Sequence, residues 1–310
     1  MNQGFDSYHI PVMLHECMEG LDIRPEGVYV DVTFGGGGHS RAILERLGSE
    51  GKLYAFDRDD DALANAINDP RFCLIHENFM HVKNFLRLYG VRQIDGLLAD
   101  LGISSHQIDE AERGFSTRMD GPLDLRMDRR EGMTAADLVN SAEENELEKI
   151  LRLYGELPNA KALAHNIVLA REGEPLSTTG QLVEAVRPLL PRGRENKVLA
   201  MLFQALRIEV NGELEALRQM LTQAAELLSD GGRICVMSYH SLEDRLVKNF
   251  FKTGNFEGEL HKDFYGNIQA PLRMVTRKPI VASEEELQAN NRARSAKLRI
   301  ACKNNKIDKQ

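Results

Sequence analysis

Two carboxylates at the ends of predicted strands could take part in chemistry on a bound ligand. Asp57 closes the strand-like run Gly51–Asp57, and Asp100 falls at the end of a second run over residues 94–101. Ligands bind at the carboxyl ends of the strands in open α/β sheets. A carboxylate there can accept hydrogen bonds from ribose hydroxyls or from a reacting amine. The positions of Asp57 and Asp100 therefore predict that a ligand binds at this edge of the sheet.

A glycine-rich turn precedes both carboxylates. Val28–Phe34 is rich in β-branched and aromatic residues, which predicts a buried strand. Gly35–Gly38 ends this run, and helix-like spacing resumes at Ser40. Glycine is needed where a ligand approaches the backbone so closely that a Cβ atom would collide. Asp57 follows Gly37 by 20 positions, which indicates an adenosine-containing cofactor.

The turn by itself leaves the cofactor open. Gly35, Gly37 and Ser40 match the dinucleotide pattern G-x-G-x-x-G with serine in the last place. Asp31 in the first strand, the glycine run and Asp57 equally describe a site for S-adenosylmethionine. A tight turn without a ligand is the simplest alternative, and four consecutive glycines argue against it.

Composition sets the broad class. The 310 residues are 42% hydrophobic and 28% charged, which is typical of a soluble globular protein. No apolar run reaches about 18 residues, and no signal peptide is visible, so we expect a cytoplasmic protein without a membrane span. Four isolated cysteines suit a reducing compartment and argue against structural zinc.

The charge pattern bears on partners. A net charge of −8 argues against broad adhesion to nucleic acid, and no DNA partner is expected. RNA stays open as a substrate because charge can be segregated. Residues 291–310 hold seven Lys or Arg against one Asp. A solvated tail and a phosphate-contacting tail explain this run equally well.

Strands alternating with helices predict an α/β protein with a mostly parallel, doubly wound sheet. More than 130 residues separate Asp100 from the next clear strand, Arg233–Tyr239, although a βαβ unit needs only about 30. Helical spacing fills most of this interval. We therefore expect a discontinuous domain of residues 1–109 and 213–310, with a helical substrate-recognition domain inserted at 110–212.

Polar residues follow two predicted strand ends and allow alternative chemistries. A Ser-His-Asp hydrolase could use Ser104 or Ser241 with His240 and Asp100, but neither serine lies in a G-x-S-x-G elbow. Metal ligation by His106 and His240 lacks the spacing of paired ligands, so no metal is expected. Ser241 is the expected N-cap of a helix that continues to residue 251.

Asp100 suits transfer of a group to an exocyclic amine. The lone pair of such a nitrogen is delocalised into its ring, and an oxygen that accepts its N–H orients the amine and helps localise the lone pair. A methyl donor that is already a sulfonium needs little further activation. Alignment of nitrogen, methyl and sulfur can then contribute about 7–11 kcal/mol. A turn cap is the alternative role for Asp100.

Eight segments carry a resemblance to one family. They are His9-x-Pro-Val, Asp31-x-Thr-Phe-Gly-x-Gly-Gly-His-Ser, Phe56-Asp57-Arg58-Asp59, Asp100-Leu-Gly-x-Ser-Ser, Glu112-Arg-Gly-Phe-Ser, Asp120-Gly-Pro-Leu-Asp-x-Arg-Met-Asp, Ser238-Tyr-His-Ser-Leu-Glu-Asp-Arg and Arg292-Ala-Arg-Ser-x-Lys-Leu-Arg. Together they closely resemble the bacterial small-subunit ribosomal RNA cytosine-N4 methyltransferases, often called MraW. The resemblance covers nearly the whole chain in order.

The resemblance implies a Rossmann-like class I methyltransferase that uses S-adenosyl-L-methionine, with a helical domain inserted after the fourth strand. It implies methylation of the N4 amine of a decoding-centre cytidine in 16S ribosomal RNA, within the small ribosomal subunit. The cofactor contacts implied by matching motifs are Gly35, Gly36, Gly37, Asp57, Phe79, Asp100 and Gln107. The sequence does not determine the oligomeric state.

The target base should be splayed out of its RNA to reach the methyl group. We expect it to enter between the carboxyl edge of the sheet and the inserted domain, with Asp100 on N4. Candidate catalytic or base-edge partners are Ser104, Ser105, His240 and Ser241. Candidate clamping or stacking residues are Arg113, Phe115 and Arg126. The alternatives are a core position for Phe115 and an ion pair of Arg126 with Asp124 or Asp128.

Some segments depart from the family pattern. Gly36 stands where some relatives carry a larger residue, which should be harmless in a glycine turn. Tyr154–Lys161 and Asn196–Gln204 are less basic than expected, which bears on the RNA-contacting surface and not on the cofactor pocket.

Three other functions compete with this one. A methyltransferase acting on a protein glutamine or a metabolite would share the cofactor turn, although the large insertion and basic tail favour a bulky substrate. A non-catalytic ribosome assembly factor is opposed by the intact Gly35–Gly37, Asp57 and Asp100. A nicotinamide oxidoreductase would be stabilised by NADH and not by S-adenosylhomocysteine.

Overall fold

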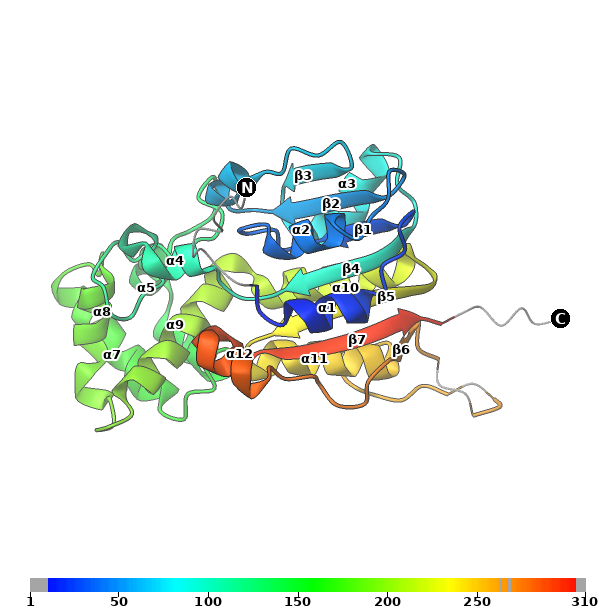
Figure 1. Ribbon diagram of the computed structural model, residues 1–310. Coiled ribbons are helices and arrows are strands. Elements are labelled where there is room, and N and C mark those ends of the chain that lie inside the picture. Colours follow the sequence, from blue (N-terminus) through cyan, green and yellow to red (C-terminus); the bar gives the residue numbers. More distant parts are fainter. Residues whose placement is uncertain (1–10, 263, 267–268, 305–310) are drawn as a thin grey trace. The chain divides into compact units, whose positions relative to one another are not determined.

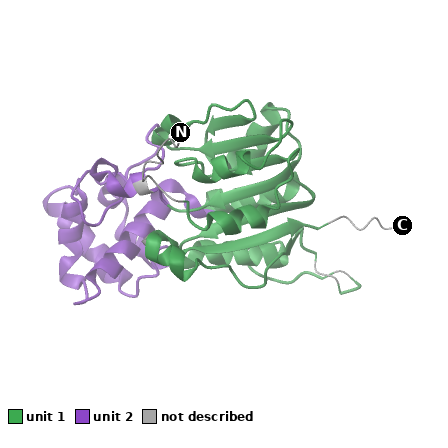
Figure 2. Cartoon of the chain, in the orientation of Figure 1, with its two compact units in different colours: residues 1–102, 215–310 green, residues 103–214 purple. Residues whose placement is uncertain are grey.

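The computed structural model describes residues 11–262, 264–266 and 269–304 (Figure 1). His9 of the family pattern and the last two lysines of the basic tail, Lys306 and Lys309, lie outside them. The chain divides into two compact units (Figure 2). Residues 1–102 and 215–310 form one, here called the sheet unit, and residues 103–214 form the other, the helical unit. The domain boundaries predicted from the sequence were at 109/110 and 212/213.

The sheet unit is built on seven strands in the order β3-β2-β1-β4-β5-β7-β6. Strands β1 to β5 pair in parallel, and β7 is antiparallel to both β5 and β6. Their bounds are β1 Val28–Asp31, β2 Lys52–Asp57, β3 Phe72–His76, β4 Ile94–Asp100, β5 Leu228–Ser238, β6 Leu272–Met274 and β7 Lys297–Lys303. The mostly parallel, doubly wound sheet expected from the sequence is confirmed.

Helices cover both faces of this sheet (Figure 1). On one face, α1 (Leu14–Leu21) and α2 (Gly38–Leu44) pack against strand side chains that include Leu53, Leu98 and Met237. On the other face lie α10 (Glu213–Leu227) and α11 (Ser241–Thr253). Burial on both faces explains why the central strand β4 is a nearly continuous apolar run.

The chain order creates a switch point beside β1. From β1 the chain passes to β2 and β3 on one side, and β4 and β5 then follow on the other side. Open α/β sheets bind ligands outside the carboxyl ends of the strands at such a point. Asp31 ends β1 and Asp100 ends β4, so both carboxylates lie at this position.

Smaller elements complete the sheet unit. After β2, Asp59 caps a short 3₁₀ helix, η1 (Asp60–Asn65), by accepting the N–H of Asp61. The remaining elements are η2 (Phe79–His81), α3 (Val82–Leu88), α12 (Glu284–Ala289) and η5 (Asn291–Ser295).

The helical unit has an apolar core of its own. Its helices are α4 (Ser105–Asp109), α5 (Ala135–Ser141), α6 (Glu144–Leu153), α7 (Ala160–Gly173), α8 (Thr179–Val186) and α9 (Glu195–Asn211), with η3 (Ala111–Arg113) and η4 (Arg187–Leu189). Leu147, Leu151, Leu202 and Leu206 are fully buried in that core, as their helical spacing predicts. Among the described residues, no helix is long and apolar enough to cross a membrane.

Candidate active site

A buried carboxylate fixes the start of the glycine turn. Asp31 is only 1% exposed, and its Oδ2 accepts a hydrogen bond from the Ser40 hydroxyl at 2.7 Å. Its Oδ1 accepts the Thr33 N–H at 3.1 Å. Burial raises the pKa of Asp31, although the neighbouring His39 and these hydrogen bonds oppose the shift. Asp31 thereby ties the end of β1 to the first turn of α2.

The turn itself leaves open space above its backbone. Gly35 and Gly37 adopt left-handed φ values of 50° and 75°, which favour glycine. A Cβ atom on Gly37 would lie 2.9 Å from the ring of Phe34. A Cβ atom on Gly35 or Gly36 would meet nothing within 4 Å. Gly36 does not have a left-handed φ either, so this position has room for a larger residue and does not require one.

Asp57 joins the turn to the end of β2. Its Oδ2 accepts the Gly35 N–H at 2.7 Å, and its Oδ1 accepts the Asp59 N–H at 2.9 Å. Burial raises the pKa of Asp57 to about 6. A carboxylate offers about four lone-pair positions, so two remain for ribose hydroxyls. Phe79 follows β3 in η2 and is half-buried.

Asp100 is held by three other segments of the sheet unit. Its N–H donates to the Thr33 hydroxyl at 2.7 Å, and its Oδ1 accepts the Tyr239 hydroxyl at 2.6 Å. Its Oδ2 lies 3.9 Å from Nδ1 of His39, whose other ring nitrogen contacts the Val12 carbonyl at 3.1 Å. Burial raises the pKa of Asp100. The carboxylate is therefore oriented, with Oδ2 the less engaged oxygen.

Tyr239 was not predicted as a site residue. Burial and the neighbouring Asp100 raise its pKa well above the usual range, so its hydroxyl stays protonated and donates. The only signal in the sequence was its position directly after a buried strand, in the segment Ser238-Tyr-His-Ser. Pairing of β4 with β5 brings it to Asp100, and the order of residues along the chain does not show this.

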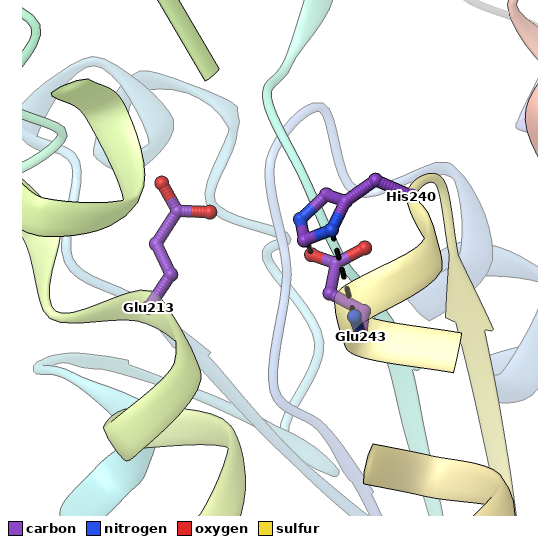
Figure 3. A group of neighbouring side chains, drawn as sticks. All are labelled: Glu213, His240 and Glu243. Carbon is purple, nitrogen blue, oxygen red and sulfur yellow. Dashed lines mark hydrogen bonds and ion pairs between the residues drawn. The ribbon is translucent and has the colours of Figure 1, made fainter. Parts of the chain in front are cut away.

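His240, rather than Ser241, caps α11, so the predicted N-cap is wrong. His240 has extended backbone angles, and its Nδ1 accepts the Glu243 N–H at 3.5 Å (Figure 3). Its Nε2 lies 3.2 Å from the Glu243 carboxylate, which also accepts the Tyr239 N–H at 2.9 Å. Ser241 already belongs to the helix and is exposed. His240 and Glu243 therefore stabilise the turn that carries Tyr239.

Two predicted site residues of the helical unit form a capping box. The Ser104 hydroxyl accepts the Gln107 N–H at 3.2 Å, and the Gln107 side-chain oxygen accepts the Ser104 N–H at 3.0 Å. Ser105 is the first residue of α4. This box fixes the start of α4. The cofactor role of Gln107 and the roles of both serines stay predictions.

The predicted clamping residues are engaged inside the helical unit. Phe115 lies in its apolar core, and Arg113 is 2% exposed and donates to the carbonyls of Arg126 and Met127. The Arg126 guanidinium makes two hydrogen bonds to the Asp124 carboxylate, at 2.8 and 3.0 Å. Both side chains are buried, which agrees with the core alternative for Phe115, and the stacking and clamping roles stay predictions.

The fold and the site define the class of protein. A parallel sheet with a switch point beside β1, an antiparallel β7 next to β5 and an open glycine turn after β1 are the features of a Rossmann-like class I methyltransferase. The space above Gly35 and Gly36 and the two remaining acceptor positions of Asp57 fit a nucleoside cofactor.

The chain belongs to the MraW methylase family, whose sequence profile matches residues 6–304. It is 56% identical over 295 residues to "Ribosomal RNA small subunit methyltransferase H" of Bacteroides thetaiotaomicron, covering 95% of this chain and 97% of that one. The protein of the same name from Cytophaga hutchinsonii is 57% identical, covering 95% and 99%. An rRNA methylase structure from Streptococcus thermophilus is 14% identical with a TM-score of 0.40, covering 96% and 99%.

The resemblance drawn from the motifs is thus confirmed, and the protein is a methyltransferase. Its cofactor is S-adenosyl-L-methionine, as predicted.

The glycine turn yields a matched pair of variants. Gly37→Ala should lower the free energy of unfolding by about 1–3 kcal/mol, because alanine is strained at this φ and its Cβ atom meets Phe34. Gly36→Ala should change it by less than about 0.5 kcal/mol, because the new methyl group enters open space. Equilibrium unfolding in urea measures both. Equal midpoints for the two variants would contradict the geometry of the turn.

Proposed function

We propose that this methyltransferase methylates the N4 amine of a cytidine in the decoding centre of 16S ribosomal RNA. The target is cytidine 1402 in the conventional numbering, within the small ribosomal subunit. The names of the relatives support ribosomal RNA as substrate, and the motif resemblance supports the atom. The structural observation that carries the proposal is the oriented carboxylate of Asp100 at the switch point of the sheet.

The cofactor supplies a methyl group that is already activated on a sulfonium. Gly35, Gly36 and Gly37 admit it close to the backbone, and Asp57 accepts the hydroxyls of its ribose. Phe79, at the end of β3, is placed to lie by the adenine. The sheet unit thereby binds the donor with residues from three consecutive strand ends.

Asp100 orients the acceptor amine. One oxygen is occupied by the Tyr239 hydroxyl, so Oδ2 is the oxygen that accepts an N–H of the cytosine N4 amine. This bond turns the nitrogen lone pair toward the methyl group, which is the alignment that the reaction requires. Tyr239 acts as a positioning residue because it fixes the plane of the carboxylate.

The proton of the product amine leaves without a strong base. Methylation gives a positively charged nitrogen that is acidic enough to release a proton to water or to a carboxylate. Burial raises the pKa of Asp100, which makes this carboxylate a better acceptor than an exposed one. Ser104, Ser105, His240 and Ser241 stay candidates for contacts to the edge of the base, and no step depends on them.

Asp100→Asn tests this role. Asparagine would keep the bond with Tyr239 through its oxygen and present an NH₂ group to the amine, where two donors face each other. We expect kcat with small subunits that lack the modification to fall by about 10²-fold or more. Radiolabel transferred from S-adenosylmethionine to RNA measures this, with equilibrium unfolding in urea as the control for folding.

Tyr239→Phe serves as the graded partner of that variant. It should lower kcat by about tenfold and leave the affinity for S-adenosylhomocysteine unchanged, because only the orientation of Asp100 is lost. Full activity of Asp100→Asn would remove Asp100 from the mechanism. Label found in protein or metabolites and not in RNA would favour a different amine substrate.

Because the pKa of Asp57 is raised, we expect cofactor binding to depend on pH. Ribose hydroxyls donate to the ionised carboxylate, and the pKa of Asp57 is raised to about 6. Affinity for S-adenosylhomocysteine should therefore be constant above that pH and fall up to about tenfold per pH unit below it. Isothermal titration calorimetry between pH 5 and 8 measures the step. Asp57→Asn should bind weakly at every pH, and a step that survives in this variant would assign it to another group.

A further inference from the structure

A basic cavity lies at the opposite end of the sheet from Asp100. Its volume is about 430 Å³, and it is found where β5 begins and β7 ends. It is lined by Gly231, Arg233, Arg273, Val275, Cys302 and Lys303. Three of these residues are cationic and none is acidic, so the cavity has the character of an anion site.

Strand pairing sets two of the cations on one face of the sheet. Cys302 of β7 is directly opposite Arg233 of β5 on one side and Arg273 of β6 on the other. Residues directly opposite in antiparallel strands project to the same face. Neighbouring strands lie nearly 5 Å apart, so the backbones of the two arginines are about 10 Å apart across Cys302. A phosphate between them can be reached by both side chains.

The positive charge of the cavity is only partly compensated. Arg233 donates to the Asp22 carboxylate at 2.7 Å and to the Gly20 carbonyl at 3.3 Å, and Lys303 donates to the neutral Ala225 carbonyl. Arg273 is exposed, and its side chain has no hydrogen bond or ion pair with any residue that the structure describes. The cavity therefore keeps an excess of positive charge.

The cavity belongs to a basic segment of an otherwise acidic protein. Residues 264–310 hold ten Lys or Arg against four Asp or Glu, whereas the whole chain holds 39 against 47. Arg277 and Lys278 are exposed just beyond β6, before Ile280 pairs with Leu298 of β7. A row of cations along the outer edge of the sheet matches a polyanion better than a single small anion.

We propose that this cavity binds a backbone phosphate of the RNA substrate, at a second site away from the catalytic edge. The proposal rests on the proposed function. The strand from Arg233 to Ser238 rises by about 3.3 Å per residue, so the cavity lies about 17 Å from the edge that carries Asp100. The phosphate held here belongs to RNA several nucleotides from the target base, or to another part of the subunit RNA.

Arg273 is the residue on which to test this second site. Arg273→Gln in the full-length protein should raise the Kd for unmodified small subunits several-fold and lower the salt slope of binding by about one. Arg273→Lys should keep most of the affinity because a phosphate contact needs mainly the charge. The kcat at saturating subunits and the affinity for S-adenosylhomocysteine should not change, since the site lies away from the chemistry.

Arg92→Gln is the matched control. Arg92 is an exposed arginine of the sheet unit, outside the cavity, and its side chain has no hydrogen bond or ion pair with any described residue. Its replacement by glutamine changes the net charge of the protein by the same amount as Arg273→Gln. Equal effects of Arg92→Gln and Arg273→Gln would reduce the result to net charge and overturn the site. Normal subunit binding by Arg273→Gln, in a protein whose wild type methylates RNA, would overturn the site and leave the proposed function standing.

Two further outcomes separate the remaining explanations. If the wild type neither binds nor methylates small subunits, the proposed function fails and the second site fails with it. The other outcome concerns inorganic phosphate, compared with chloride at equal ionic strength. If phosphate stabilises the wild type and not Arg273→Gln, and both proteins bind subunits equally well, the cavity is a site for free phosphate. The RNA assignment is then overturned.

Discussion

Two carboxylates at the switch point of the sheet, the buried Asp31 and the half-buried Asp100, need hydrogen-bond donors, and the site is built around the groups that supply them. An unpartnered charge there would be strongly destabilising. The Asp31 carboxylate is satisfied by Ser40 and Thr33, and the Asp100 carboxylate by Tyr239. These bonds join the end of β1, the start of α2, the end of β4 and the turn before α11. The hydrogen bonds that orient the Asp100 carboxylate therefore also stabilise this edge.

The two ends of the sheet unit carry opposite electrostatic character. Carboxylates gather at the carboxyl ends of the parallel strands, which is the proposed site for the sulfonium donor and the acceptor amine. At the other end, Arg233 near the start of β5, Arg273 of β6 and Lys303 at the end of β7 line the basic cavity. This segregation explains how a chain with a net charge of −8 can act on RNA. On the two proposals made above, the acceptor base and the RNA backbone are recognised by separate surfaces of the same sheet.

The features that could be predicted from the sequence are those that depend on short stretches of residues. Alternating strands and helices, the glycine turn and the positions of Asp57 and Asp100 follow from periodicity and turn chemistry. Tyr239 and the cap formed by His240 could not be predicted, because they depend on which strands pair and on the exact residue at which α11 begins. Arg113 and Phe115 were assigned to RNA because they lie in a family segment, and nothing in their local pattern shows that both side chains are buried.

The chemical identity of the methylated product decides whether the protein acts on the N4 amine of a cytidine. Small ribosomal subunits that lack the modification would be incubated with the protein and S-adenosylmethionine, and their RNA digested and analysed by mass spectrometry. We expect N4-methylcytidine at one position of the 16S RNA. A methyl group on another atom or on a ribosomal protein, or no product from a protein that binds the cofactor, would contradict this expectation.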